Sequence, residues 1–379
     1  MKIYQKAILP SAFKANAVAS GIKRSGKLDL ALFYSTLPAK AACLFTSNTI
    51  QAAPIQVNKR YLRHNADFRG IIVNSGNANC FTGKSGLGDA EGMSASAARA
   101  LGVKKESILV SSTGIIGRRL PLVKVKKAIP DLVKGLSGPG INKAKVAIMT
   151  TDTFAKEVSV KFRSGGDEVT VCGIAKGAGM IAPDMATMLS FVCTDAAITR
   201  AALKKALKLA VAGSFNSITV DGCMSTNDMV ILLANGASGC PRIDTGKSFN
   251  LFLKALNTVC LELAKMIVRD AEGATRFIKI NVLKARTAAE AKTIALAIAN
   301  SNLFKTAIHA GSPNFLGRTV ASIGSTGIGV KESGLKIKIS SLKMHDITLD
   351  VSVDRGKACA TIYTADLTRD YIKINAEYN

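Results

Sequence analysis

The chain has no tryptophan, only three histidines among its 379 residues, and an aromatic content of 5%. Its core must therefore be filled mainly by Ala, Val, Ile, Leu and Met, in line with a hydrophobic content of 48%. His64, His309 and His345 sit in no recognisable motif, so we interpret each as an ordinary surface or core residue. Nothing in the sequence supports a Ser–His–Asp or Cys–His catalytic site.

Motifs for nucleotide binding, hydrolysis and metal binding are missing as well. There is no GxSxG, no GK[ST] loop and no HExxH. The eight cysteines are widely spaced without a CxxC pair, which predicts reduced, mostly buried thiols rather than disulfides or a zinc site. We therefore expect no metal and no tightly held cofactor.

Long apolar runs and acidic residues are also scarce. No apolar run approaches the roughly 18 residues that span a bilayer, and residues 1–14 lack the core of a signal peptide, so we expect a cytoplasmic protein without membrane contact. The 51 basic residues exceed the 26 acidic ones, for a net charge of +25. Because the basic clusters are dispersed and not interleaved with aromatics, they indicate a general surface bias that attracts anionic substrates. The alternative, a nucleic-acid-binding protein, would bind in a salt-sensitive way and show no chain cleavage.

Strand and helix patterns alternate along the chain, which predicts an α+β fold of mixed or antiparallel sheets covered by helices. Period-2 patterns predict strands at 27–35, 278–282, 347–353 and 371–374, and a hairpin of 158–162 with 168–174. Helical periodicity predicts helices at 90–101, 200–212, 248–269 and 287–300. Residues 74–79 are predicted to form a polar turn.

Because no histidine is a candidate base, we consider a nucleophile that carries its own base. If the bond before a Thr is cut, the new α-amine, with a pKa of about 7.7–8.0, can take the proton of its own hydroxyl. The segment 176–196, KGAGMIAPDMATMLSFVCTDA, places Gly and Pro residues before Thr187 and an apolar stretch after it. The residues alone equally allow a glycine-rich turn entering a buried strand, with Thr187 merely capping it.

This segment closely resembles the cleavage-site signature of the ornithine acetyltransferase (glutamate N-acetyltransferase) family of arginine biosynthesis. Further matches run in order over most of the chain: Phe45-Thr46-Ser47-Asn48 with Ala52-Ala53-Pro54, the turn at 74–83, Ser112-Thr113-Gly114-Ile115-Ile116-Gly117, Met149-Thr150-Thr151-Asp152-Thr153, Asp221-Gly222 with Ser225-Thr226-Asn227-Asp228, Glu272-Gly273-Ala274-Thr275, and Ile374-Asn375-Ala376 with Tyr378.

The resemblance implies self-cleavage between Ala186 and Thr187, and a fold like that of N-terminal-nucleophile aminopeptidases. Residues 1–186 would form an α chain and residues 187–379 a β chain, interlocked as one catalytic unit and assembled as a heterotetramer of two copies of each. Thr187 would become the N-terminal nucleophile and carry the acetyl group as an ester. The Thr113 hydroxyl and the Gly114 N–H would form the oxyanion hole.

The resemblance also implies the reaction, a ping-pong transfer of acetyl from N-acetylornithine to glutamate, and leaves open whether acetyl-CoA is a second donor. The implied substrate contacts are Thr153, Lys176, Thr187, Glu272 and Asn375. Lys176 would pair with a substrate carboxylate, and Glu272 with an amino group. The alternative function is that of a self-cleaving N-terminal-nucleophile aminopeptidase or amidohydrolase.

Four features depart from the family pattern, one of which is a Pro-Asn-Trp-Gly stretch that reads Pro313-Asn314-Phe315-Leu316-Gly317 here. Asp184 stands where the family usually has Asn, and Ala271 replaces the first Gly of Asp-Gly-Glu-Gly. The family's chain usually runs on to a terminal Ser or Thr that helps to bind substrate, whereas this one ends at Asn379. The Asp184 carboxylate is expected to alter self-cleavage or the pKa of the α-amine.

Overall fold

The structure, a computed structural model, describes residues 1–182 and 188–377. The chain divides into two compact units, each with its own hydrophobic core: unit 1 comprises residues 1–177, 184–215 and 224–263, and unit 2 comprises residues 178–183, 216–223 and 264–379. Both units combine helices with a sheet, which confirms the predicted α+β class. The units do not coincide with the two predicted cleavage products, because unit 1 draws on both sides of residue 187.

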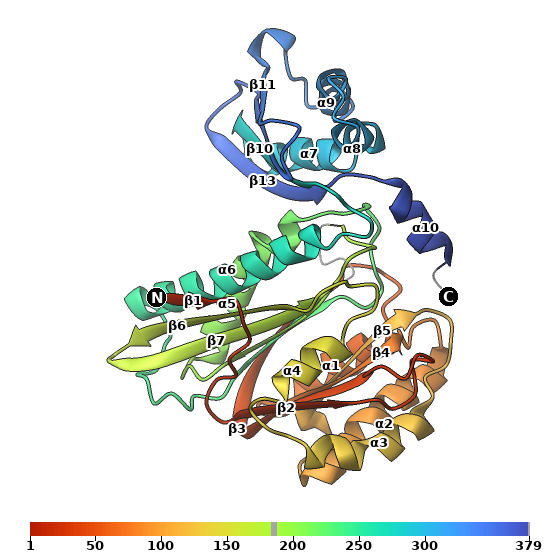
Figure 1. Cartoon of the computed structure of the whole chain (residues 1–379). Coiled ribbons are helices and arrows are strands. Elements are labelled where there is room, and N and C mark those ends of the chain that lie inside the picture. Colours follow the sequence, from red (N-terminus) through yellow and green to blue (C-terminus); the bar gives the residue numbers. More distant parts are fainter. Residues whose placement is uncertain (183–187, 378–379) are drawn as a thin grey trace. The chain divides into compact units, whose positions relative to one another are not determined.

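Unit 1 is built on a sheet in the order β1-β6-β7-β8-β9-β3-β4-β5, with β2 paired to β3 (Figure 1). The β4–β5 and β8–β9 pairs are parallel and the others antiparallel. The strands are β1 (Lys2–Tyr4), β2 (Phe13–Val18), β3 (Leu30–Phe45), β4 (Phe68–Asn77), β5 (Ile108–Ile115), β6 (Lys156–Ser164), β7 (Asp167–Lys176), β8 (Leu189–Thr194) and β9 (Met229–Ala234). The long β3 joins the two halves of this sheet, since its first half pairs with β2 and β4 and its second half with β9.

The helices of this region are α1 (Ala53–His64), α2 (Gly83–Leu101), α3 (Leu122–Lys134), α4 (Ile141–Ala147), α5 (Arg200–Ala212) and α6 (Gly246–Arg269). In Figure 1, α1 to α4 gather around β2 to β5, whereas α6 lies along β6 and β7. Helix α5 contacts β3 and β9. The close approach of α6 depends on Gly173 in β7, because a Cβ there would lie 2.5 Å from Cγ1 of Val259 and 2.9 Å from Cδ1 of Leu263.

Unit 2 contains a second sheet in the order β11-β12-β10-β13, in which only β10 and β12 pair in parallel. Its strands are β10 (Phe277–Ala285), β11 (Lys336–Ile339), β12 (Asp346–Ser352) and β13 (Ala358–Ala365). Its helices are α7 (Ala288–Ala299), α8 (Asn302–His309), α9 (Phe315–Gly324) and α10 (Arg369–Glu377). Along the whole described chain, the short 3-10 turns are η1 (Lys105–Ser107, in unit 1), η2 (Phe215–Ser217) and η3 (Glu332–Gly334).

Most predicted elements are confirmed, but the strand predicted at 371–374 is wrong. These residues lie in α10. The backbone N–H of Tyr371 is accepted by the Thr368 hydroxyl at 3.4 Å, and the Asn375 side chain bonds the Tyr371 carbonyl at 3.0 Å. The Thr368 cap and the bond from Asn375 therefore stabilise a helix here, although the sequence alternates as in a strand.

Two predicted boundaries also need correction. The expected polar turn at 74–79 is largely strand, because β4 continues to Asn77. Its polar residues are satisfied inside the fold: the Asn74 side chain donates to the Asn77 carbonyl at 2.8 Å and accepts from the Ser112 hydroxyl at 2.6 Å. The helix expected at 90–101 begins earlier, at Gly83, and ends as predicted before Gly102 in the left-handed conformation. All eight cysteines are free, and five of them are buried.

A buried asparagine fixes β5 in place. β5 is the last strand of its sheet, so one side of its backbone has no strand partner. Asn58 of α1 fills that position for Val110, accepting its N–H at 2.9 Å and donating to its carbonyl at 2.7 Å. The side chain thus acts as a short substitute for a neighbouring strand.

We expect Asn58→Ala to lower the free energy of unfolding by roughly 2–4 kcal/mol, because a buried donor and a buried acceptor lose their partner together. Gln56→Ala, at an exposed position of the same helix, should change it by less than about 0.5 kcal/mol. Urea denaturation followed by circular dichroism measures both. Equal losses in the two variants would contradict this role for Asn58.

Candidate functional site

The predicted oxyanion pair lies near the end of β5 in unit 1. Thr113 is 6% exposed, and Gly114 is paired with Gly76 of the parallel strand β4. Gly114 has φ +132°, and a Cβ there would lie 2.4 Å from the carbonyl carbon of Gly76. Only glycine fits this position, and this explains why the Thr-Gly sequence, rather than Thr followed by a larger residue, occurs here.

Three consecutive residues connect this strand end to the segment that follows Thr187. The side-chain amide of Asn227 donates to the Ser112 carbonyl at 2.8 Å. The Asp228 carboxylate accepts the backbone N–H of Met188 at 2.8 Å, and Met229 donates its N–H to the Met188 carbonyl at 3.2 Å. The residue before Thr113 and the residue after Thr187 are therefore bound to one short stretch of chain.

The predicted cleavage residues themselves, Ala186 and Thr187, lie outside the described residues, as does Asp184. Their neighbours on the C-terminal side are well defined. Met188 and Leu189 are buried, and Leu189 starts β8 opposite Lys176, the last residue of β7. Lys176, the predicted substrate-binding lysine, thus pairs with a residue that follows the predicted nucleophile by two positions in the sequence.

Lys176 is only 3% exposed and has a carboxylate close by. Asp152 accepts the N–H of Gly177, the next residue, at 2.7 Å, and the Thr150 N–H at 2.9 Å. Asp152 also forms a fully buried ion pair with Lys156, whose ammonium nitrogen is 2.7 Å from Oδ1. Burial alone would raise the pKa of Asp152, but the charges of Lys176 and Lys156 and the bond from Gly177 hold that pKa well below its usual value.

A third lysine contributes to the positive charge near Lys176. The ammonium group of Lys23 donates to the carbonyls of Leu28 at 3.0 Å, Ala147 at 3.3 Å and Met149 at 2.8 Å. Its pKa is lowered to about 8, first by burial and then by the charge of Lys176, against the opposing effect of Asp29. With more basic than acidic groups, this region suits the binding of a carboxylate.

Thr153 follows Asp152 in the bend between α4 and β6 and is exposed. It belongs to unit 1 with Thr113, Gly114 and Lys176, whereas Glu272 and Asn375 belong to unit 2.

In unit 2 the two predicted substrate residues contact each other. The Asn375 side-chain amide donates to the Glu272 carboxylate at 2.8 Å. A Cβ at Gly179 would lie within 2.2–2.6 Å of that carboxylate group, so Gly179 is required for Glu272 to lie where it does. The Glu272 N–H is bonded to the Ala178 carbonyl at 3.1 Å. Glu272 and Asn375, which the family resemblance assigns to one site, are therefore joined by a direct hydrogen bond.

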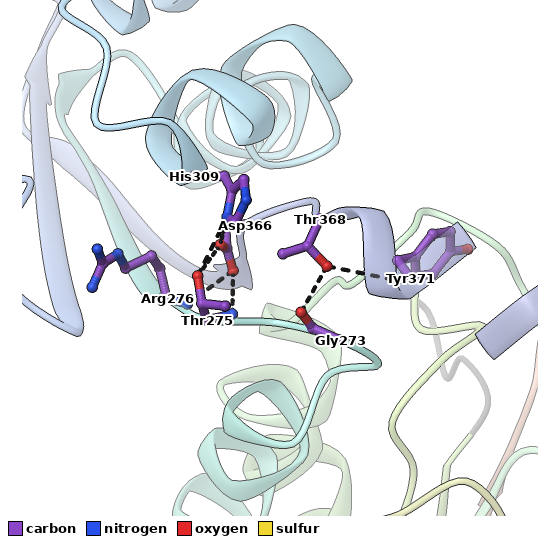
Figure 2. Close-up of polar contacts among 7 residues, drawn as sticks. All are labelled: Gly273, Thr275, Arg276, His309, Asp366, Thr368 and Tyr371. Atoms are coloured by element: carbon purple, nitrogen blue, oxygen red, sulfur yellow. Dashed lines mark hydrogen bonds and ion pairs between the residues drawn. The ribbon is translucent and has the colours of Figure 1, made fainter. Parts of the chain in front are cut away.

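Figure 2 shows the hydrogen bonds that connect the start of α10 and the end of β13 to residues 273–276. The Thr368 hydroxyl donates to the Gly273 carbonyl at 2.7 Å. Asp366 accepts the backbone N–H groups of Thr275 and Arg276, both at 2.8 Å, and lies 2.9 Å from Nδ1 of His309. These bonds hold the 273–276 segment and the start of α10 together, and with them the two partners Glu272 and Asn375.

Sequence reasoning assigned no role to Asp152, Asn227 and Asp228, although all three lie in motifs that it matched. Each is buried and binds backbone groups. For Asp152 the available signal was its position next to Thr153; for Asn227 and Asp228 it was only their place in the matched motif 225–228.

The described residues contain neither a metal-binding cluster nor a membrane-spanning helix. Within residues 1–182 and 188–377, no group of three or more His, Cys, Asp and Glu side chains could hold a metal ion. In the same part of the chain, none of the helices combines the length and the apolar character needed to cross a membrane.

Unit 1 thus contains a strand end that carries Thr113 and Gly114, a buried Lys176, and a well-defined residue after Thr187. The family model described as the ArgJ family matches residues 14–346. The chain belongs to the ArgJ family. This membership confirms the resemblance and the expectation of an N-acetyltransferase of arginine biosynthesis.

Curated relatives match along nearly the whole chain. The arginine biosynthesis bifunctional protein ArgJ of Geobacter sulfurreducens is 41% identical, covering 97% of this chain and 98% of its own length. The protein of the same name from Caldanaerobacter subterraneus subsp. tengcongensis is 43% identical, with 98% and 97% covered. A solved structure of ornithine acetyltransferase from Mycobacterium tuberculosis, complexed with ornithine, is 37% identical, covering 48% of this chain and 97% of its own, with a TM-score of 0.45.

The buried Asp152 leads to a prediction about pH. Because its folded pKa is depressed, its contribution to stability is fully present above the unfolded value of about 3.9 and is lost as pH falls toward the folded value. Asp152→Asn should be roughly 2–4 kcal/mol less stable at pH 7, since it leaves buried lysine charge uncompensated. Its stability should then fall less than that of the unchanged protein between pH 5 and pH 3. Urea unfolding at these pH values measures both effects, and parallel pH profiles would contradict the ion-pair role.

Proposed function

We propose that the chain cleaves itself between Ala186 and Thr187 and then transfers acetyl from N-acetylornithine to glutamate through an acetyl ester of Thr187. The observation that carries the proposal is the stretch 227–229, which binds both the residue before the Thr113-Gly114 pair and the residue after Thr187. A nucleophile at residue 187 is thereby tied to the same stretch as two candidate oxyanion donors.

In the proposed cleavage, the Thr187 hydroxyl oxygen attacks the Ala186 carbonyl carbon. The C–N bond breaks, the hydroxyl proton passes to the departing amine, and an ester links the two chains. Water then hydrolyses this ester, which leaves a carboxylate on Ala186 and a free amine and hydroxyl on Thr187. The products are the α chain of residues 1–186 and the β chain of residues 187–379.

In the proposed transfer, the α-amine of Thr187 takes the hydroxyl proton while the oxygen attacks the acetyl carbonyl. Negative charge develops on the carbonyl oxygen, where the Thr113 hydroxyl and the Gly114 N–H donate to it. One such donor contributes roughly 2.7–4 kcal/mol to the stability of the transition state. The acetyl C–N bond then breaks, and the protonated Thr187 amine gives its proton to the departing amine of ornithine. The amine of glutamate next attacks the ester and loses a proton to the Thr187 amine, which returns it to the hydroxyl as N-acetylglutamate leaves. Since protons and charge are handled by these groups, the chemistry requires no metal and no bound cofactor.

The substrate contacts follow from charge. Lys176, supported by its basic neighbours, would bind an α-carboxylate, with Thr153 as a further polar contact. Glu272, oriented by Asn375, would bind an amino group. The relatives are named bifunctional, and the net charge of +25 would favour an anionic donor, so we include acetyl-CoA as a second acetyl donor. We further propose a heterotetramer of two α and two β chains that acts in the cytoplasm.

The proposal predicts that the purified protein consists of two chains that begin at Met1 and Thr187. Mass spectrometry under denaturing conditions measures this directly. Thr187→Ala should remain one chain and be inactive, because it lacks the attacking hydroxyl. Thr187→Ser is the matched control, since it keeps a hydroxyl and should still be cleaved. An intact chain of 39.7 kDa that persists for days at neutral pH would contradict self-cleavage.

Substrate charge gives a second prediction. Lys176→Met should reduce kcat/KM for both N-acetylornithine and glutamate, because both carry an α-carboxylate. Glu272→Gln keeps the shape but loses the charge, so it should impair N-acetylornithine more than N-acetylglutamate as donor. The difference should be about ten- to a hundredfold, the usual effect of a lost charge-assisted hydrogen bond. Equal losses for the two donors in Glu272→Gln would contradict the charge-pairing role. Hydrolysis of a short peptide by the unchanged enzyme would instead favour the aminopeptidase alternative.

A further inference from the structure

The chain changes units twice around the predicted cleavage site. Gly177 belongs to unit 1, residues 178–183 to unit 2, and Met188 again to unit 1. At each of these three places an aspartate accepts backbone N–H groups. Asp152 binds Gly177, as described above, and two further aspartates bind the segments on either side of residues 182–187.

On the upstream side the aspartate is Asp221. Its carboxylate accepts the N–H of Met180 at 2.6 Å through Oδ2 and the N–H of Ile181 at 2.9 Å through Oδ1. The Ile181 carbonyl accepts the N–H of Val220 at 2.8 Å and the hydroxyl of Thr219 at 3.1 Å. All these residues belong to unit 2, so Ile181 is held from both sides of its peptide backbone.

The upstream segment is held in a conformation that its sequence does not favour. Met180 has φ +56°, in the left-handed region that costs a residue with a side chain roughly 1–2 kcal/mol. Lys305, which is 2% exposed, donates to the Val220 carbonyl next to Asp221 and adds a positive charge near that carboxylate. Strain of this kind persists only where surrounding bonds impose it, and it accumulates at functional segments.

On the downstream side the aspartate is Asp228, which is 1% exposed and accepts the Met188 N–H at 2.8 Å. The Met188 carbonyl is bonded to Met229, and the parallel pairing of β8 with β9 starts at the next residue. This contact lies wholly in unit 1 and does not involve the bond that is cut. It therefore continues to hold the β chain after cleavage.

We propose that Asp221 and Asp228 are positioning residues for self-cleavage, and that only Asp228 also serves the later acyl transfer. The inference rests on the proposed cleavage before Thr187. Asp221 fixes residues 180–181, upstream of the scissile bond, and Asp228 fixes Met188, downstream of it. Once the bond is cut, residues 180–181 belong to the α chain, while Asp228 still holds the nucleophile through Met188.

The physical reason is conformational entropy. Six residues, 182–187, join Ile181 to Met188. A flanking residue whose backbone is already fixed by hydrogen bonds has less freedom left to lose when the hydroxyl approaches the carbonyl that it attacks. Releasing the upstream residues restores that freedom and slows cleavage. Releasing the downstream end does the same, and it also frees the nucleophile in the mature enzyme.

The test compares Asp221→Asn and Asp228→Ala with the unchanged chain, synthesised in a cell-free system and followed by timed denaturing gels. At position 221 asparagine keeps the size but can accept only one of the N–H groups of Met180 and Ile181, because its NH2 group is not an acceptor. At position 228 the amide oxygen of asparagine would still accept the Met188 N–H, so alanine is used there. Both variants should be cleaved at least tenfold more slowly. After long incubation, cleaved Asp221→Asn should have a kcat for acetyl transfer within about twofold of the unchanged enzyme, whereas kcat of Asp228→Ala should fall at least tenfold.

Tyr371→Phe is the matched control, because it removes the hydroxyl bond to Asp221 at 3.3 Å but leaves the backbone N–H bonds from Met180 and Ile181 intact. It should be cleaved at the normal rate. If Asp221→Asn does not fold, as judged by near-UV circular dichroism, Asp221→Glu replaces it, since it keeps the charge but displaces the carboxylate, and slow cleavage is again expected. If Asp228→Ala does not fold, Asp228→Glu replaces it on the same ground. Normal cleavage of a folded Asp221 variant, or normal kcat in a folded Asp228 variant, overturns this inference alone. Lack of cleavage in the unchanged chain overturns the proposed function.

Discussion

The arrangement around the proposed cleavage site depends on one interaction, the hydrogen bond from the Met188 N–H to the buried carboxylate of Asp228. It fixes the residue after Thr187 at the start of β8, where parallel pairing with β9 then continues. The adjacent Asn227 side chain bonds the carbonyl of Ser112 and so fixes the strand that carries the Thr-Gly pair. A nucleophile and its oxyanion donors can thus be aligned by the backbone, without a histidine to bring them together.

Charge supplies the second constraint. Lys176, Lys156 and Lys23 are buried or largely buried, and of the nearby acids Asp152 is the one that bonds both Lys156 and the residue after Lys176. Buried lysines without a partner would destabilise the fold, and a full set of partners would leave no charge for a substrate carboxylate. Under the proposed function, the same buried groups would serve both the stability of the fold and the binding of a substrate carboxylate. The surface excess of basic residues extends this field over longer distances.

Patterns local in sequence were predicted well. The helix at 200–212, the hairpin around residues 164–166 and the mixed α+β class are found as expected, because each depends on periodicity or on turn residues. The failure at 371–374 arose because a cap at Thr368 and a tertiary bond from Asn375 to Glu272 decide the conformation there. The bonds of Asp221 and Asp228 join residues about 40 positions apart, a relation that no single-sequence pattern encodes. The roles of Thr187, Thr113 and Gly114 stay predictions that rest on the resemblance and on these contacts.

The most direct test of the central claim is to trap the acyl enzyme. The purified protein is incubated with N-acetylornithine in the absence of glutamate, quenched in acid and analysed by mass spectrometry with peptide mapping. The account predicts that the chain beginning at Thr187 gains one acetyl group, located on the Thr187 hydroxyl, and loses it when glutamate is added. An acetyl group on another residue, or ornithine release from a cleaved protein that never becomes acetylated, would contradict it.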